Sequence, residues 1–245
     1  MLKLEHLTWN LPDSGLGIVN DVALSIPEGK LVVITGPNGG GKTTLAKLIA
    51  GLLTPSSGKI WFDGTDITGS DLTARARMGL GYAFQQPVRF KGITVRDLLN
   101  LAAGHPLDEA ALCALLGKVG LCAEEYVDRE MSASLSGGES KRIEIATVLA
   151  RKAKYAIFDE PEAGIDLWSF ARLVSTFEEL RNQHCGTQVI ISHQERILSI
   201  ADEIIVIADG KIRTQGTREE ILPSLLTGEW QSRCPRNSEE VSCNG

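Results

Sequence analysis

The sequence contains no long hydrophobic run. Its purely apolar stretches are short, such as IIVIA at 204–208, whereas a membrane helix needs about 20 apolar residues in succession. The opening residues MLKLEHLTWN lack an apolar segment behind a basic start, so we expect no signal peptide and a cytoplasmic location. We therefore expect no direct membrane insertion, and any role at a membrane would come through a partner protein.

The 245-residue chain also lacks an excess of basic side chains, because its formal net charge is −6. An acidic chain is poorly matched to a phosphate backbone, so we expect no nucleic-acid partner, although local amides can still bind a nucleotide. Its five cysteines are odd in number and form no CxxC pair, which favours reduced thiols. A metal or cluster site at Cys234 and Cys243 is the alternative.

Short apolar segments alternate with segments of helical periodicity. The segments that predict buried strands are 31–35, 155–158, 187–192 and 203–208. This alternation predicts an α/β fold with a mainly parallel sheet. Asp63-Gly64 and Asp209-Gly210 each follow a predicted strand and predict tight turns.

The chain divides into a long domain and a polar tail. Residues 92–150 are mostly helical in pattern and predict a helical subdomain. We expect one domain over residues 1–226 and a loose tail over 227–245, where periodicity is lost.

Residues 36–44, GPNGGGKTT, match the phosphate-loop pattern G-x-x-x-x-G-K-[ST]. The loop follows a predicted strand and opens a predicted helix, so its amides and the positive end of the helix would both face a phosphate. We expect Lys42 to reach the β- and γ-phosphates of ATP and Thr43 to ligate Mg²⁺. The expected ATP-binding residues are Gly36, Pro37, Asn38, Gly39, Gly40, Gly41, Lys42, Thr43 and Thr44.

Two carboxylates end the predicted strand in YAIFDE (155–160). Ligands of open α/β sheets bind at the carboxyl ends of the strands. We therefore expect Asp159 to hold Mg²⁺ and Glu160 to orient and activate the attacking water. The alternative is that both carboxylates are solvent-exposed in a turn and have no role. The upstream phosphate loop makes this alternative less favoured.

Residues 135–142, LSGGESKR, begin a predicted helix. Ser136 and Glu139 form a capping box, which explains both side chains without any ligand. A capping box does not require Gly137 and Gly138, and glycine in a first helical turn is unfavourable unless something approaches the backbone. A phosphate supplied by a second chain would be such a group. The segment thus predicts a head-to-tail homodimer that forms around ATP.

The order of phosphate loop, Gln85, LSGGE, FDE and His193 resembles the ATP-binding cassette ATPases over residues 1 to about 226. The resemblance implies a P-loop NTPase fold with a mainly parallel sheet core, an N-terminal antiparallel β subdomain and an inserted helical subdomain. It also implies ATP hydrolysis with Mg²⁺ as cofactor.

The family resemblance assigns roles to single residues. Glu160, His193 and Gln85 are the implied catalytic residues, and Thr43, Gln85 and Asp159 the implied metal ligands. Gln85 would also face a partner protein, although its neighbour Gln86 is an alternative for this role. Ser136, Gly137 and Gly138 would contact the γ-phosphate bound by the opposite copy, and Asp166 would lie at the dimer interface. Leu11 stands where many members have an aromatic residue that stacks on adenine, with Trp9 two residues away.

Four segments separate this chain from most transporter ATPases: LSGGESKR, DEPEAGID, SHQERIL and FQQPVRFKG. They resemble the ATPase subunit of the SUF iron–sulfur cluster assembly machinery, which implies a soluble scaffold partner near Gln85. The nucleotide-binding subunit of an ABC transporter is the alternative. A ribosome- or DNA-associated cassette is less favoured because the chain has neither a second cassette nor a coiled-coil insertion. An inert binding module is less favoured because Lys42, Asp159, Glu160 and His193 occur together.

Overall fold

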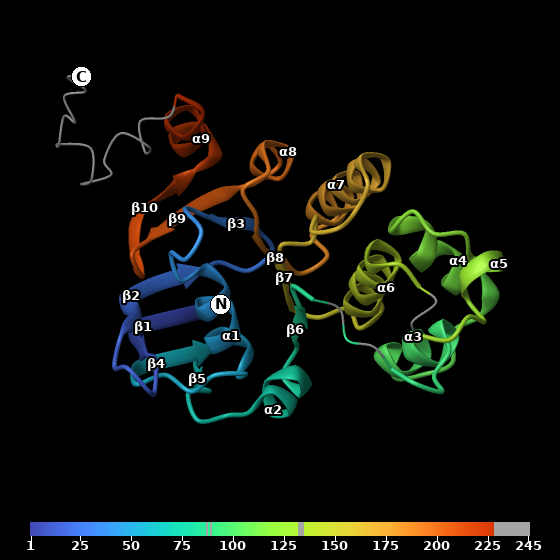
Figure 1. Ribbon diagram of the computed structural model, residues 1–245, viewed down its shortest axis with the longest axis horizontal. Coiled ribbons are helices and arrows are strands. Elements are labelled where there is room, and N and C mark those ends of the chain that lie inside the picture. The colour runs from blue at the N-terminus through green and yellow to red at the C-terminus, as the bar shows by residue number, and fades with distance from the viewer. Residues whose placement is uncertain (87, 89, 132–134, 228–245) are drawn as a thin grey trace, which may run out of the picture.

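The computed structural model describes residues 1–86, 88, 90–131 and 135–227. A six-stranded sheet with the order β10-β9-β3-β8-β7-β6 lies at its centre (Figure 1). The strands are β3 (Leu31–Thr35), β6 (Leu80–Ala83), β7 (Tyr155–Asp159), β8 (Thr187–Ile191), β9 (Glu203–Ala208) and β10 (Lys211–Thr217). Neighbouring strands are parallel except β9 and β10. The predicted parallel α/β sheet is confirmed, with one antiparallel strand at its edge.

A second, antiparallel sheet has the order β2-β1-β4-β5. Its strands are β1 (Leu2–Asn10), β2 (Gly17–Ile26), β4 (Ser57–Phe62) and β5 (Thr65–Asp66). With α1 (Lys42–Ala50) it encloses a hydrophobic cluster against one face of the larger sheet. This is the antiparallel β subdomain that the family resemblance implies.

Both predicted Asp-Gly turns are present. Asp63 and Gly64 join β4 to β5 with φ angles of 49° and 80°, and Asp209 and Gly210 join β9 to β10 with 52° and 73°. Two-residue hairpin turns need positive φ at both positions, which the Asp-Gly pair tolerates.

Some of the remaining helices lie at the edges and on the other face of the larger sheet, and the others lie farther from it, at the right of Figure 1. They are α2 (Leu72–Arg77), α3 (Val95–Ala103), α4 (Glu109–Lys118), α5 (Ala123–Tyr126), α6 (Gly137–Ala150), α7 (Leu167–Asn182), α8 (Glu195–Leu198) and α9 (Arg218–Leu226). Helix α6 contacts α3 and α4 on one side and β6 and β7 on the other. It therefore lies between the sheet and the helices of the predicted subdomain.

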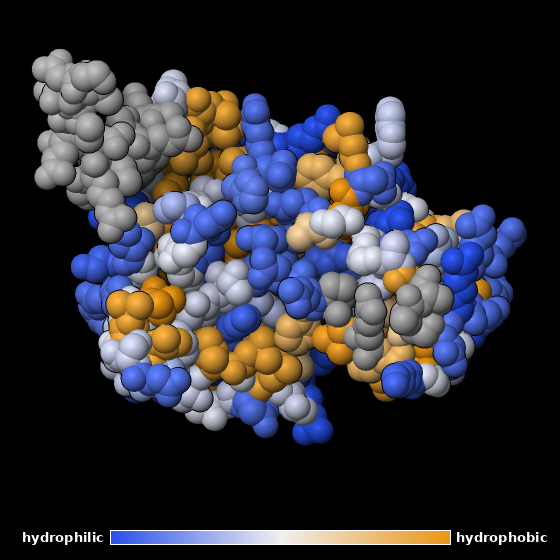
Figure 2. Space-filling model, in the orientation of Figure 1, coloured by the Kyte–Doolittle hydropathy of each residue, from blue (hydrophilic) through white to orange (hydrophobic). Residues whose placement is uncertain are grey.

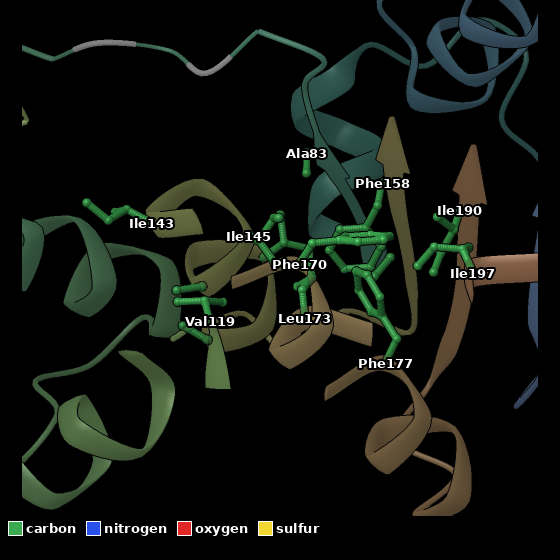
Figure 3. Close-up of a cluster of buried hydrophobic side chains, with 14 of the residues drawn as sticks. Ala83, Val119, Ile143, Ile145, Phe158, Phe170, Leu173, Phe177, Ile190 and Ile197 are labelled. Atoms are coloured by element: carbon green, nitrogen blue, oxygen red, sulfur yellow. The ribbon is translucent and has the colours of Figure 1, made fainter. Parts of the chain in front are cut away.

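One hydrophobic core runs from the larger sheet into α3–α7. Figure 3 shows Phe158 of β7 against Phe177 of α7, whose ring centroids are 4.9 Å apart, with Ile145 of α6 nearby. Ile143 and Ile145 are both fully buried although they point to different sides of α6. Because the core is continuous, the boundaries of the helical subdomain at residues 92–150 stay a prediction.

The surface alternates between polar and apolar areas. The face in Figure 2 carries several separate hydrophobic areas among hydrophilic ones. Within the described part of the chain, no helix combines the length and the apolar character needed to cross a membrane. Cys113, Cys122 and Cys185 are exposed free thiols. Cys234 and Cys243 lie outside the described residues, as does most of the predicted tail.

Candidate active site

The loop at residues 36–41 connects β3 to α1 and packs tightly on neighbouring backbone. A Cβ at Gly36 would lie 2.0 Å from the carbonyl oxygen of Ile207, and one at Gly41 would lie 2.6 Å from that of Ile18. Gly41 is the N-cap of α1 and has φ 99°, a conformation that glycine adopts without strain. The fold thus needs glycine at both ends of the loop, whatever the loop binds.

This loop forms one wall of a cavity of about 460 Å³. The cavity lies at the carboxyl ends of parallel strands, where α/β folds bind ligands. Its lining residues are Ile18, Asn38, Gly39, Gly40, Gly41, Lys42, Thr43, Thr44, Gln85 and Glu160. Most of the predicted ATP-binding residues and two of the three predicted catalytic residues therefore meet at one cavity.

Lys42 is folded back on the phosphate loop. Its Nζ donates hydrogen bonds to the carbonyl oxygens of Gly36 (2.7 Å) and Pro37 (2.9 Å). Burial lowers the pKa of Lys42, while the nearby charges of Glu160 and Asp159 act in the opposite direction. A cationic donor held at the centre of the loop is suited to a polyphosphate.

Thr43, which lines the cavity, contacts Asp159, which is not among the described lining residues. The Thr43 hydroxyl donates to Asp159 Oδ1 at 3.0 Å, and the Tyr82 hydroxyl donates to Oδ2 at 2.9 Å. Asp159 is fully buried, and burial raises its pKa although both hydrogen bonds favour the charged form. A hydroxyl and a carboxylate at this spacing fit Mg²⁺, which prefers one or two protein oxygens together with water and substrate phosphates. Sequence reasoning missed Tyr82.

Glu160 and Gln85 contact each other at the mouth of the cavity. Gln85 Nε2 donates to Glu160 Oε2 at 2.7 Å, which brings together two loops that are far apart in the sequence. Gln85 rather than Gln86 is the glutamine that lines the cavity. Glu160 has a left-handed backbone with φ 46°, which is strained for a residue with a side chain.

His193 follows β8 but is not among the described residues that line the cavity. Its side chain is exposed. The preceding residue, Ser192, is fully buried and donates from Oγ to Glu162 Oε1 at 2.6 Å. The structure therefore places His193 beside the site rather than in it, and it shows a carboxylate at Glu162 that sequence reasoning missed.

The predicted capping box at the start of α6 is confirmed. Ser136 Oγ accepts from the Glu139 amide at 3.2 Å, and Glu139 Oε2 accepts from the Ser136 amide at 2.7 Å. The Tyr126 hydroxyl also donates to Glu139 and is the main reason that the pKa of this carboxyl is lowered. Of the described residues that line the cavity, none comes from Ser136–Gly138.

The two glycines of this segment differ in their surroundings. A Cβ at Gly138 would lie 2.6 Å from the carbonyl oxygen of Gly164, whereas one at Gly137 would meet open space. Packing within this chain thus explains why residue 138 is glycine. The sequence-based interpretation attributed this glycine to the approach of a phosphate. The phosphate interpretation remains necessary only for Gly137.

Asp166 ends the loop that packs on Gly138. Its Oδ1 accepts from the amides of Trp168 (3.1 Å) and Ser169 (3.0 Å), so Asp166 is the N-cap of α7. The Ser169 hydrogen bonds are the largest cause of its lowered pKa. The structure explains Asp166 by helix capping, and its place in a dimer interface stays a prediction.

A buried ion pair connects α6 to the catalytic loops, and sequence reasoning missed it. Lys141 donates from Nζ to the carbonyl oxygens of Phe84 and, at 3.2 Å, of Asp159. Glu144 lies 3.8 Å from Lys141 Nζ and accepts from the Phe84 amide at 2.8 Å. Burial raises the pKa of Glu144 to about 7.

The two candidate positions for adenine stacking differ in burial. Leu11 is 40% exposed, and Trp9 packs partly buried against the core of the antiparallel sheet. Ile18 of β2 is the apolar residue that lines the cavity.

Comparison with known proteins identifies the family. The model of the ABC transporter family matches residues 19–163. An uncharacterized ABC transporter ATP-binding protein of Methanocaldococcus jannaschii is 37% identical over 229 residues, which cover 90% of each chain. The lipopolysaccharide export system ATP-binding protein LptB of Escherichia coli K12 is 33% identical over 212 residues, 85% of this chain and 88% of LptB.

A solved structure shows the same fold. It is a dimeric ATP-binding cassette in a post-hydrolysis state bound to ADP and Pi, and it matches with a TM-score of 0.80 at 23% identity, over 89% of this chain and 99% of that one. The two sequence relatives are named for transport or export, and none of the three matches points to iron–sulfur assembly. The phosphate loop, the Thr43–Asp159 pair and these matches agree, and the chain belongs to the ABC transporter family of ATP-hydrolysing cassettes.

Proposed function

We propose that the chain hydrolyses ATP as one half of a head-to-tail dimer and that this cycle drives movement in a partner protein. The observation that carries the proposal is the division of the motifs. The phosphate loop, Gln85 and Glu160 line one cavity, whereas Ser136–Gly138 lie outside it. Helix α6 can direct its N-terminal amides at a phosphate only if a second copy supplies that phosphate.

The predicted phosphate-, metal- and water-binding residues each have a defined task in this proposal. The phosphate-loop amides and Lys42 hold the β- and γ-phosphates. Thr43, Asp159 and Gln85 are the residues that would hold Mg²⁺, which neutralises phosphate charge when bound. Glu160 orients the attacking water and accepts its proton. Glu160 can do this while it stays bonded to Gln85, because only one of its two carboxylate oxygens accepts from the glutamine amide.

The second copy completes the site. The amides at the start of α6 and Ser136 contact the γ-phosphate, and His193 donates a hydrogen bond to it from the copy that binds the ATP. Closure excludes water, which strengthens each of these charged contacts in the transition state. Hydrolysis then removes the shared phosphate, and the two copies separate.

Glu160→Gln tests this proposal. The amide cannot accept the proton of the attacking water but preserves the shape of the side chain. We expect turnover to fall at least about a hundredfold and ATP to hold the variant as a dimer. Size-exclusion chromatography with light scattering, with and without ATP, measures the dimer. Glu178→Gln is the matched control, because Glu178 is exposed on α7 and is not among the described residues that line the cavity. A monomeric Glu160→Gln protein that still hydrolyses ATP would contradict both the base assignment and the shared site.

The partner would dock beside Gln85. Val88 is 43% exposed and Phe90 is 37% exposed in the segment that follows Gln85, so apolar surface is available there. Lys141 and Glu144 hold the start of this segment through Phe84, which joins it to α6 and Asp159. The hydrogen bond between Gln85 and Glu160 would transmit movements of Glu160 to a protein docked there.

Two classes of partner fit this surface. The names of the relatives favour the membrane permease of an ABC transporter. The residues Glu139, Lys141 and Arg142, with the SHQERIL segment, favour a soluble iron–sulfur cluster scaffold. Purification of the native complex distinguishes them. A multi-helix protein that co-purifies from detergent-solubilised membranes supports the permease, and a soluble protein that co-purifies without detergent supports the scaffold.

A further inference from the structure

Glu162 presents a buried carboxylate oxygen near His193, one of the predicted catalytic residues. Its Oε1 accepts from Ser192 Oγ at 2.6 Å, and Ser192 Oγ in turn accepts from the Gln194 amide at 3.0 Å. Its Oε2 is buried and has no hydrogen-bond partner within the described part of the chain. Leaving a buried carboxylate oxygen unpaired costs free energy, so a partner in another state of the protein is expected.

His193 is the group placed to become that partner. It is the residue after Ser192, and its charge is among those that act on Glu162. Glu160 and Lys141 also carry charges that act on this carboxylate. Glu160 repels a second carboxylate. Lys141 already donates to the backbone carbonyl oxygens of Phe84 and Asp159. Of these three side chains, the exposed imidazole of His193 is therefore the one that can turn toward Glu162 and donate to it.

We propose that Glu162 is a positioning residue for His193: its Oε2 accepts the imidazole N–H when His193 turns from solvent toward the γ-phosphate of bound ATP. The inference rests on the proposed function, because it requires His193 to act on ATP. Ser192 fixes the carboxylate, and the carboxylate fixes the imidazole ring.

The chemistry of imidazole explains why such an acceptor is useful. A histidine that donates to a phosphate from one ring nitrogen needs its other nitrogen defined, and a carboxylate acceptor defines it. A negative charge at Glu162 also stabilises the imidazolium form, which donates from both nitrogens. The exposed His193 side chain becomes ordered only when both partners are present, so ATP and Glu162 act together.

A double-mutant cycle tests the proposal. The variants are Glu162→Gln, His193→Ala and the double variant, with Glu162→Asp to restore the charge. Turnover is measured from pH 6 to 9 on ATP-saturated protein, and thermal unfolding and ATP affinity report on folding. We expect Glu162→Gln to lower turnover about tenfold, the scale of one lost hydrogen bond to a charged group. We expect no further loss when the same change is made in His193→Ala protein.

Three further results bear on the inference. The alkaline fall in turnover should move to lower pH in Glu162→Gln protein, and Glu162→Asp should recover part of the activity. Equal losses from Glu162→Gln with and without His193 would overturn the inference and leave the proposed function intact, because they would show that the carboxylate only ties the loop to β8. Full turnover of His193→Ala protein would overturn the role of His193 in the proposed function, and the inference with it.

Discussion

We propose that phosphate is bound at the phosphate-loop cavity and at the start of α6, and these two regions differ in completeness. At the cavity the predicted site residues already contact one another, with Thr43 bonded to Asp159 and Gln85 bonded to Glu160. At the start of α6 the capping box satisfies the Glu139 amide, and the earlier amides of the helix point away from the helix body. In the proposed dimer, one copy therefore builds nearly all of one site and supplies the missing part to the site of the other copy.

Disrupting either the phosphate loop or the start of α6 should abolish turnover, but only disruption of the phosphate loop should weaken ATP binding to a single copy. We expect Lys42→Ala and Gly137→Asp each to lower turnover at least about a hundredfold, because each removes or opposes a charge contact in the transition state. Lys42→Ala should also lower the ATP affinity of the monomer, whereas Gly137→Asp should not. Isothermal titration with a non-hydrolysable ATP analogue measures that affinity.

The Gly137→Asp variant provides its own folding control. A carboxylate in the first turn of a helix stabilises it, and a side chain at this position meets open space. The thermal midpoint should therefore be unchanged or higher. A loss of monomer affinity in this variant would place the start of α6 in the cavity of its own chain, which is incompatible with a phosphate shared between two copies.

The two glycines of α6 should respond differently to alanine. A Cβ at Gly138 would clash with the Gly164 carbonyl, so we expect Gly138→Ala to lower the free energy of unfolding by about 2 kcal/mol. Gly137→Ala should be neutral or slightly stabilising, because alanine is the better helix former. Urea unfolding of both variants measures the difference, and equal effects would contradict the packing role of Gly138.

The ion pair that joins α6 to the Gln85 loop should give a pH-dependent stability. The pKa of Glu144 is raised to about 7 from 4.5, so between these values the folded protein keeps a proton that the unfolded chain has lost. The contribution of Glu144 to stability is then fully present below pH 4.5 and is lost as pH rises to about 7. The non-titrating Glu144→Gln variant should gain about 2 kcal/mol relative to wild type between pH 4.5 and 6.

Urea unfolding at several pH values measures this gain, with Glu178→Gln as the control that should show none. A stability difference that stays constant over this range would show that Glu144 is ionised in the folded protein throughout.

The smallest expected effect concerns Asp166 at the start of α7. Asp166→Ala removes the acceptor of two amides and should cost about 1 kcal/mol of stability, whereas Asp166→Asn keeps the acceptor and should cost less. Thermal unfolding compares them. If both variants keep full stability but lose ATP-dependent dimer formation, the residue belongs to the interface rather than to the cap.

The sequence predicts those parts of the site that lie within short segments. The phosphate loop, the carboxylates at the end of β7 and the capping box each depend on local geometry, and all three are present. The contacts of Tyr82 with Asp159 and of Glu162 with Ser192 join segments 77 and 30 residues apart, so no local pattern indicates them. The packing of Gly138 on Gly164 was missed for the same reason.

Mixing two inactive variants tests the shared site most directly. Lys42→Ala protein keeps a working α6 start, and Gly137→Asp protein keeps a working phosphate loop. A mixed dimer therefore contains one intact site, and random pairing should restore about a quarter of wild-type ATPase activity. Fluorescent labels confirm that the subunits exchange in the presence of ATP. If they exchange and the mixture is no more active than the two variants measured separately, the result would contradict the head-to-tail dimer.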